Sequence, residues 1–469
     1  MLVKRTLTHK VIDWIFKNPS RMIIFSFLLV ITVGSILLFL PFSTYSGHHL
    51  NYFEALFTSV SAVCVTGLIV TDTATTFTLF GKLVIIILIQ IGGLGLITIT
   101  SFIFSFTRKK QDFRTRLVAL ETSGSFSFKE APLLLNFIFG ITFGCEFIGG
   151  ILLSLAYVPV YGWAHGLGKA FFQSVSAFCN AGFDLMGNTE SGPYASLTGY
   201  VGSPLIVITT CGLILIGGLG FTVWVDLFGK IMNHKKNRLK VHSKIVLEWT
   251  LILVLVGFFA LFILEFSNSG TMEGMSFKNR VLSSFFQSVT FRTAGFNTID
   301  LGNLTNPSKT VGILLMFIGA GSGSTGGGIK ITTFAIIVYS VISEIKGNKD
   351  TVTHRHTLSS AIVRRAVAIF FIGITVVIGL SLLLSITEHQ AIMAGNFNFI
   401  DVVFEVTSAF ATVGVSSLGT PNLLTISKLL LIPAMFLGRV GPISLALSLA
   451  MRDSRKIGEV YPEGKIHIG

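Results

Sequence analysis

The chain has 469 residues, of which 51% are hydrophobic and only 12% are charged, and its mean hydropathy is +0.77. Soluble domains carry about 25% charged residues, so this composition argues against an ordinary soluble protein and indicates an integral membrane protein. The formal net charge of +13 comes from basic residues that lie between apolar runs, which fits the positive-inside rule and argues against a nucleic-acid partner.

Apolar runs long enough to cross a bilayer, which takes about 20 residues, occur in four pairs along the chain. We expect these spans at roughly 22–41 and 79–106, 131–157 and 203–232, 243–267 and 309–344, and 362–387 and 424–451. Between the members of each pair lies a shorter run, beginning near Tyr52, Gly168, Lys278 and Phe399. These runs are too short to span a membrane, so each is predicted to be a re-entrant half-helix.

Each half-helix leads into a short segment that contains one glycine. The four segments are Val65, Thr66, Gly67 and Leu68; Asn180, Ala181, Gly182 and Phe183; Thr293, Ala294, Gly295 and Phe296; and Thr412, Val413, Gly414 and Val415. Glycine reaches backbone angles that align carbonyl groups, and backbone carbonyls can replace the water around a cation. The four segments are therefore predicted to form a selectivity filter that holds a cation through backbone carbonyls.

This pattern predicts an all-α integral membrane fold with four pseudo-symmetric repeats around one central pore. Each repeat would be a helix, a pore helix and a helix (M1–P–M2), giving eight membrane spans and four re-entrant pore helices. The expected repeats are 1–110, 111–235, 236–350 and 351–469, the last with a C-terminal tail. The linkers between repeats are basic and the opposite loops are poor in Lys and Arg, which predicts cytoplasmic N- and C-termini.

The second helix of each pair carries a glycine cluster, beginning at Gly92, Gly217, Gly319 and Gly438. Close packing of helices through small residues is an alternative explanation for these clusters. In the third repeat the cluster is too long for a helix, because each glycine costs about 1 kcal/mol there. We expect this helix alone to be broken, with the loop lining the pore as a gate. The expected gate residues are Gly319, Ala320, Gly321, Ser322, Gly323, Ser324, Thr325, Gly326, Gly327, Gly328 and Lys330.

Arg439 occupies the equivalent cluster of the fourth repeat. A charge inside a membrane span is costly and is usually functional. We expect Arg439 to hydrogen-bond carbonyls of the gate loop or to repel cations, the alternative being a structural pair with a carboxylate. The loop is not expected to bind nucleotide, because Lys330 is followed by Ile331 and the pattern GxxxxGK[ST] is absent.

The stretches VCVTGL, FCNAGF, FRTAGFN and FATVGV, the IGGLG clusters and the Gly-rich insert resemble the KtrB/TrkH superfamily of potassium-transporting subunits over nearly the whole chain. The resemblance is strongest to the bacterial KtrB-type membrane subunit. It implies K+ uptake across the plasma membrane without a covalent cofactor, with Na+ as a candidate activator. It also implies a homodimer that docks a cytosolic, KtrA-type nucleotide-binding regulatory ring. Plant relatives that prefer sodium carry serine where this chain has Gly67.

Two other classes of function compete with a cation pore. An alternating-access secondary transporter for a cation is the alternative, but such proteins often contain inverted repeats, whereas repeats with two spans each run parallel. An enzyme is not expected, because no nucleophile–base arrangement or metal-ligand spacing is found. The basic linkers are suited to contact either a regulatory partner or anionic membrane lipids.

Overall fold

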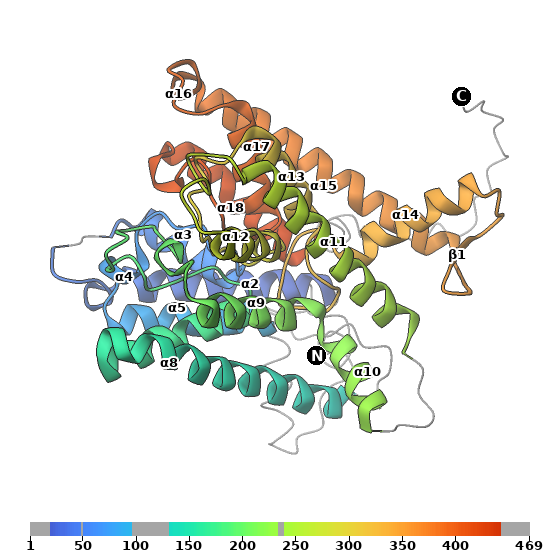
Figure 1. Ribbon diagram of the computed structural model, residues 1–469, viewed down its shortest axis with the longest axis horizontal. Coiled ribbons are helices and arrows are strands. Elements are labelled where there is room, and N and C mark those ends of the chain that lie inside the picture. Colours follow the sequence, from blue (N-terminus) through green and yellow to red (C-terminus); the bar gives the residue numbers. More distant parts are fainter. Residues whose placement is uncertain (1–18, 48–49, 96–130, 233–238, 442–469) are drawn as a thin grey trace, which may run out of the picture.

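The computed structural model describes residues 19–47, 50–95, 131–232 and 239–441, and this part of the chain is mostly helical (Figure 1). Its main elements in chain order are α2 (Pro19–Phe39), α3 (Tyr52–Val63), α4 (Thr73–Thr76), α5 (Leu79–Leu94), α8 (Ala131–Phe178), α9 (Pro204–Leu219), α10 (Phe221–Met232), α11 (Val241–Glu265), α12 (Phe277–Thr290), α13 (Asn306–Phe317), α14 (Ile331–Ile345), β1 (Thr351–Thr353), β2 (His356–Leu358), α15 (Ser360–Thr387), α16 (His389–Met393), α17 (Phe399–Phe410) and α18 (Thr425–Val440). Single 3-10 turns lie at Pro41–Ser43, Thr198–Tyr200 and Thr420–Asn422.

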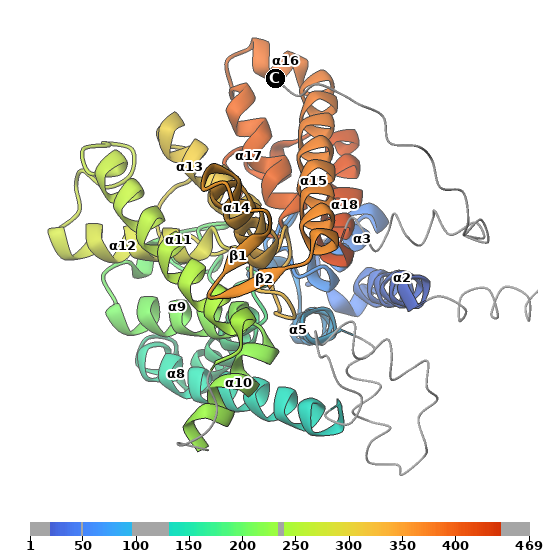
Figure 2. The ribbon, with the colours of Figure 1, turned by 90° about the vertical axis from the view of Figure 1, so that its right-hand side faces the viewer.

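The helices form four groups that follow one another in sequence: α2, α3 and α5; α8 and α9; α11, α12 and α13; and α15, α17 and α18. Figure 2 shows these groups placed around a common centre. The helix that follows each glycine segment packs against the next group, in the pairs α5 with α8, α9 with α12 and α13 with α17. Because α18 in turn packs against α3, the fourth group closes on the first.

Three short helices begin within one residue of their predicted starts, because local signals define their first turns. The Glu54 carboxylate accepts from the backbone N–H of Asn51 at 2.9 Å, and Asp401 accepts from Asn398 at 3.0 Å. These reciprocal contacts are capping boxes. In α12 the hydroxyl of Ser276 accepts from the N–H of Asn279 instead.

The second short helix differs from the prediction in its start. It is continuous with the preceding helix in α8, apart from a kink at Gly162, where φ is 76° and ψ is 170°. The short helix therefore starts after Gly162 rather than near Gly168. Gly168 lies inside the helix, and the positive φ at Gly162, which favours glycine, sets the boundary.

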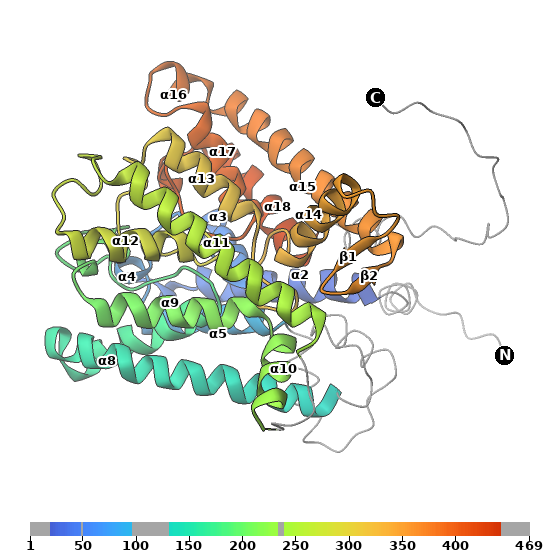
Figure 3. The ribbon, with the colours of Figure 1, turned by 45° about the vertical axis from the view of Figure 1, so that its right-hand side comes forward.

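The expectation that only the third repeat has a broken second helix is wrong. The predicted span 203–232 consists of α9 and α10, which are bent by 97° (Figures 1 and 3). Gly220, with φ 98°, separates them. The N–H of Phe221 donates to the carbonyl of Gly323 at 3.0 Å, so α10 starts against the Gly-rich loop of the third group.

The other helices that follow the filters also end at the glycine clusters. Helix α5 ends at Gly95 with φ 81°, and α18 ends at Gly441 with φ 89°. The predicted continuations to residues 106 and 451 lie outside the described residues. In the third group α13 stops at Phe317, and α14 begins after the Gly-rich loop, as expected. A short antiparallel hairpin of β1 and β2, which we did not predict, follows α14 (Figure 3).

Four helical segments are long and apolar enough to cross a membrane, namely Arg21–Phe39, Leu135–Phe178, Val241–Glu265 and Ser360–Thr387; the bent pair α9 and α10 would be a fifth. Their outer faces expose large apolar side chains such as Leu29, Phe147, Ile263 and Ile386. Exposed apolar surface on this scale marks contact with lipid or with a partner. The fold is thus that of a multi-pass membrane protein, while the count of eight spans stays a prediction.

Candidate functional site

The four glycine segments share an unusual backbone conformation. The residue two positions before each glycine has a positive φ: 56° at Val65, 59° at Asn180, 74° at Thr293 and 52° at Thr412. The glycines themselves have φ between 71° and 91°. Left-handed angles at non-glycine residues cost about 1–3 kcal/mol each and cluster at functional sites. Four strained residues at one repeated position therefore indicate a functional site.

Hydrogen bonds to the short helices hold this backbone in place. The residue before each glycine donates its N–H to a carbonyl near the end of the preceding helix. These bonds are Thr66 to Ser61 at 2.8 Å, Ala181 to Ser176 at 2.8 Å, Ala294 to Thr290 at 2.9 Å and Val413 to Ser408 at 2.8 Å. In a trans peptide the C=O points opposite to the N–H. The carbonyls of the strained residues therefore point away from the ends of the short helices.

The four glycines form a closed ring. A Cβ atom added to any of them would lie 3.0 Å or less from the backbone carbonyl oxygen of the residue before another filter glycine. The contacts run from Gly67 to Ala181, from Gly182 to Ala294, from Gly295 to Val413 and from Gly414 to Thr66. Each segment thus touches the next, and the last touches the first. At this level there is room for glycine only.

A cavity of about 390 Å³ opens on one side of this ring, and all four filter glycines line it. Asp72, Asp184 and Asp300 also line it, and among the described lining residues there is no Lys or Arg. Carboxylates at the mouth of a narrow pore attract cations. We call this cavity the vestibule.

The carboxyl group of Asp184 is set apart by its surroundings. Burial, followed by the nearby charge of Asp72, raises the pKa of Asp184 to about 6. Hydrogen bonds from the N–H of Met186, at 2.8 Å, and from Ser196 oppose this rise. Asp72 joins the first two groups, because its side chain accepts from the N–H of Tyr194 at 3.1 Å.

The Gly-rich loop between α13 and α14 lies against the other side of the filter ring. The Thr325 hydroxyl donates to the Phe178 carbonyl and to the Asn180 side chain, both at 3.1 Å. A Cβ at Gly326 would strike the Thr293 hydroxyl, and one at Gly327 would strike that of Thr412. The loop therefore meets the strained residues of three of the four filters, and its glycines are needed for this close approach.

Backbone hydrogen bonds fasten the loop to its surroundings. Gly321 donates to the carbonyl of Gly218 at 2.8 Å, which attaches the loop to the cluster of the second group. Gly319 donates to Ile329 at 2.8 Å, and Ile331 donates to Ala320 at 3.1 Å, which close the base of the loop. The ammonium of Lys330 reaches back and donates to the carbonyl of Gly326 at 2.5 Å.

Arg439 connects the loop to two other groups. Its guanidinium donates to the carbonyl of Thr325 in the loop and to the carbonyls of Gly92 and Gly93, the last at 3.0 Å. The expected hydrogen bond to a loop carbonyl is therefore present, and within the described residues no carboxylate forms an ion pair with Arg439. One side chain thus bridges the first, third and fourth groups directly beneath the filter.

The structure brings the predicted site residues into one cluster. The four glycine segments touch one another, the Gly-rich loop contacts three of them, and Arg439 contacts that loop. Within the described residues there is no cluster of three or more His, Cys, Asp and Glu side chains that could hold a metal ion. The ring brings backbone carbonyl oxygens together, and such oxygens can replace the water around a monovalent cation.

Some residues of this site were not predicted as functional. The vestibule aspartates Asp72 and Asp184 have no predicted role, and Gly220 falls inside the continuous span predicted at 203–232. The positions of Ser61 and Ser408 relative to the glycines did repeat in the sequence. Their hydroxyls accept from the N–H groups of Gly67 at 3.0 Å and Gly414 at 3.1 Å, so this spacing was a usable signal.

Comparison with known proteins places the chain in a family. The profile of a family described as "TrkH: Cation transport protein" matches residues 3–459. The chain is 38% identical to the Ktr system potassium uptake protein B of Bacillus subtilis (strain 168), over 98% of this chain and 99% of that protein. It is 36% identical to the potassium/sodium uptake protein NtpJ of Enterococcus hirae, over 96% and 97% of the two chains.

A solved structure shows a similar fold. The potassium transporter TrkH from Vibrio parahaemolyticus superposes with a TM-score of 0.72 and 19% sequence identity, covering 92% of this chain and 84% of that one. At this identity the match supports the architecture alone. The family profile and the full-length relatives, however, show that this protein belongs to the TrkH family of cation transport proteins.

Proposed function

We propose that the protein takes up K+ through a pore whose selectivity filter is the ring of Gly67, Gly182, Gly295 and Gly414 with the residues beside them. The observation that carries this proposal is the closed ring of glycine-to-carbonyl contacts between neighbouring segments. Left-handed angles at the first and third residues of each segment support this, because a filter that replaces a hydration shell needs carbonyls that turn inward. The names of the two relatives, both potassium uptake proteins, support K+ as the ion.

The four groups are proposed to be M1–P–M2 repeats with the boundaries expected from the sequence, making eight spans in total. Passage through the pore is gated by the Gly-rich loop, residues 319–328 with Lys330, and by Arg439. Support comes from the loop's contacts with the strained residues of three filters and from the bond between Arg439 and Thr325. A loop in this position blocks the axis, so ions pass only after the loop moves.

Partners and ion coupling are also proposed from the relatives. The Enterococcus hirae protein is named for potassium and sodium, which supports Na+ as an activator or coupled ion. The Bacillus subtilis protein is named as part of a Ktr system, which supports a separate cytosolic regulatory ring. We further propose a homodimer in the plasma membrane, with both termini in the cytoplasm because the linkers between repeats are basic.

The competing function is an alternating-access cation transporter. In such a protein the ion site is closed from one side at a time by the movement of whole repeats. The closed ring of filter contacts argues against this, because moving one repeat would break contacts on both of its sides.

Complementation of a K+-uptake-deficient bacterial strain, with and without Na+ and a coexpressed regulatory ring, tests the proposal. Growth at low K+ that depends on this protein is the expected result. A well-expressed protein that gives neither growth nor K+ uptake under any of these conditions would refute the function. Uptake that never exceeds carrier turnover rates would favour alternating access instead.

A further inference from the structure

Three of the four groups place a lysine at the same position in the helix that follows the filter. Each is the fourth residue after the helix N-cap, and each ammonium donates to a backbone carbonyl of the loop leading out of its own filter. The pairs are Lys82 with Ala74 at 2.8 Å, Lys309 with Gly302 at 2.9 Å and Lys428 with Pro421 at 2.8 Å. Gly302 and Pro421 line the vestibule. The lysines therefore hold the outer ends of their filters.

The short helix of the next group faces this position with a residue whose charge differs from one group to another. The third residue after the N-cap is Glu54 in α3 and Asp401 in α17. The equivalent residues of the second and third groups, at the same distance before the filter glycine, are Lys169 and Leu282. Each helix after a filter packs against the next group, and we call each of these four contacts a corner of the pore. The four corners therefore have different charges.

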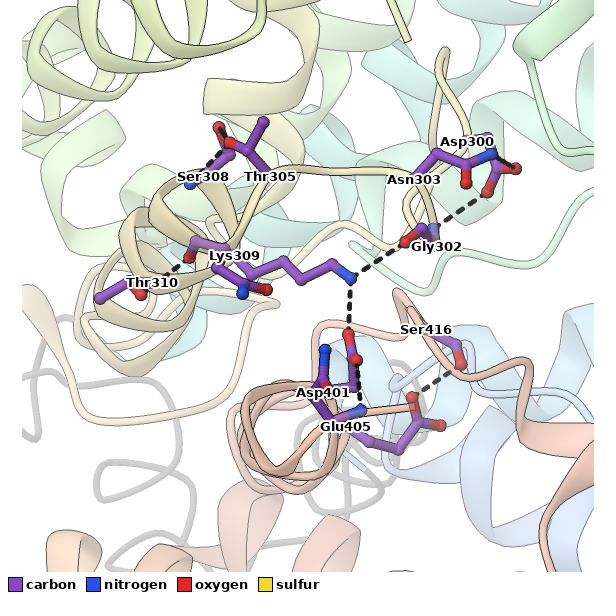
Figure 4. Close-up of polar contacts among 12 residues, drawn as sticks. Asp300, Gly302, Asn303, Thr305, Ser308, Lys309, Thr310, Asp401, Glu405 and Ser416 are labelled. Atoms are coloured by element: carbon purple, nitrogen blue, oxygen red, sulfur yellow. Dashed lines mark hydrogen bonds and ion pairs between the residues drawn. The ribbon is translucent and has the colours of Figure 1, made fainter. Parts of the chain in front are cut away.

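Only one of these corners contains a direct ion pair among the described residues. Lys309 Nζ lies 2.6 Å from Asp401 Oδ1, and the two side chains are 7% and 6% exposed (Figure 4). At the fourth corner Glu54 acts on Lys428 through its charge alone. At the first corner Lys82 and Lys169 repel each other. The corner between the third and fourth groups is therefore the one that is fastened electrostatically.

The ion pair joins parts of both neighbouring filters. Lys309 holds the carbonyl of Gly302, beyond the third filter, while the other oxygen of Asp401 caps α17, which leads to the fourth filter. One turn further along α17, Glu405 accepts from the Ser416 hydroxyl of the fourth loop at 2.7 Å (Figure 4). It also accepts from the Thr420 hydroxyl at 2.6 Å. Helix α17 is thus attached to the loops that leave two adjacent filters.

We infer that Lys309 and Asp401 are positioning residues for ion selection, a role that rests on the proposed function as a K+ pore. The distance between carbonyls on opposite sides of a filter determines the size of the ion whose hydration shell they can replace. In an ion pair buried away from water, loss of one partner is strongly destabilising, because it leaves an uncompensated charge. The pair therefore sets the spacing between the third and fourth filters, although neither side chain contacts the ion.

Ion uptake by purified protein in proteoliposomes tests this role, with Lys309→Met, Asp401→Asn and the double variant. The double variant leaves no unpaired buried charge, so it is the variant expected to fold even where the single ones do not. For the double variant we expect the KM for K+ and the ratio of Na+ to K+ uptake to rise about tenfold, with a smaller change in maximal rate. Lys309→Arg, which keeps the charge and its donors, should retain most of the discrimination.

Lys278→Met is the matched control, because Lys278 is an exposed lysine on α12. It should leave both quantities unchanged. A folded double variant with the KM and ion ratio of the unaltered protein would overturn the inference, as would variants that change only protein abundance or maximal rate. If the unaltered protein itself transports no K+, the proposed function fails instead, so the two outcomes are distinguishable.

Discussion

Arg439→Ala should release the Gly-rich loop. The substitution removes three hydrogen bonds, of which the one to the Thr325 carbonyl holds the loop and the two to Gly92 and Gly93 hold the arginine. A hydrogen bond to a charged group contributes about 1.5–3 kcal/mol. Losing the Thr325 bond should therefore shift the ratio of closed to open loop by about 10- to 150-fold, since each 1.4 kcal/mol is a factor of ten. Removal of the positive charge beneath the filter acts in the same direction.

The assay is K+ or Rb+ flux into proteoliposomes that contain the membrane subunit without a regulatory partner. We expect the basal flux of Arg439→Ala to be about tenfold higher or more. Arg439→Lys separates the two causes, because it keeps the charge but has fewer donors: a closed pore with lysine would assign the barrier to charge. Lys346→Ala, at an exposed site after α14, serves as the control for loss of a positive charge. A folded Arg439→Ala protein with unchanged flux would show that the arginine does not hold the gate.

Three other predictions follow from the same geometry. Gly67→Ser should lower the discrimination of K+ over Na+, because the serine Cβ would strike the Ala181 carbonyl. Gly47→Ser is the control, because Gly47 has a similar positive φ but nothing within 4 Å of its Cβ position. Equal ratios of K+ to Na+ uptake in the two variants would contradict this prediction. Lowering the pH through about 6 should protonate Asp184, remove a negative charge from the vestibule and reduce uptake at low K+. Asp184→Asn should flatten that pH profile, and an unchanged profile would exclude Asp184 as its source. Gly220→Ala should destabilise the bend and lower the melting temperature, because φ is 98° and the Cβ would meet the Ser322 carbonyl; a higher melting temperature would refute the strain argument.

The sequence was most informative where structure depends on neighbours along the chain. The starts of α3, α12 and α17 follow from capping residues, and the filter backbone follows from glycines that repeat at near-equal intervals. Where long-range contacts decide, prediction failed. Ile91–Gly95 and Ile216–Gly220 have the same sequence, so the sequence gives no sign of the bend after Gly220. That bend depends on a long-range hydrogen bond from Phe221 to the carbonyl of Gly323.

The electrostatic features of the site were hidden for a similar reason. Asp72 and Asp184 come from different groups and meet only when the ring closes. Lys309 and Asp401 are far apart in sequence, and neither motif nor spacing links them directly. A signal was nevertheless available, because Lys82, Lys309 and Lys428 recur at one position of their helices. Comparing the repeats with one another at every position, rather than at the glycines alone, would have found it.

The ring of glycines closes within a single chain, and this changes what one substitution can do. In a pore assembled from four identical subunits, each substitution is present in all four subunits. It therefore changes the free energy of ion binding four times over. Here Thr66, Ala181, Ala294 and Val413 can each change alone, although changes in two neighbouring segments need not add, because those segments touch. Ion preference can therefore evolve in small steps, one corner at a time, without the whole filter having to tolerate each change at once.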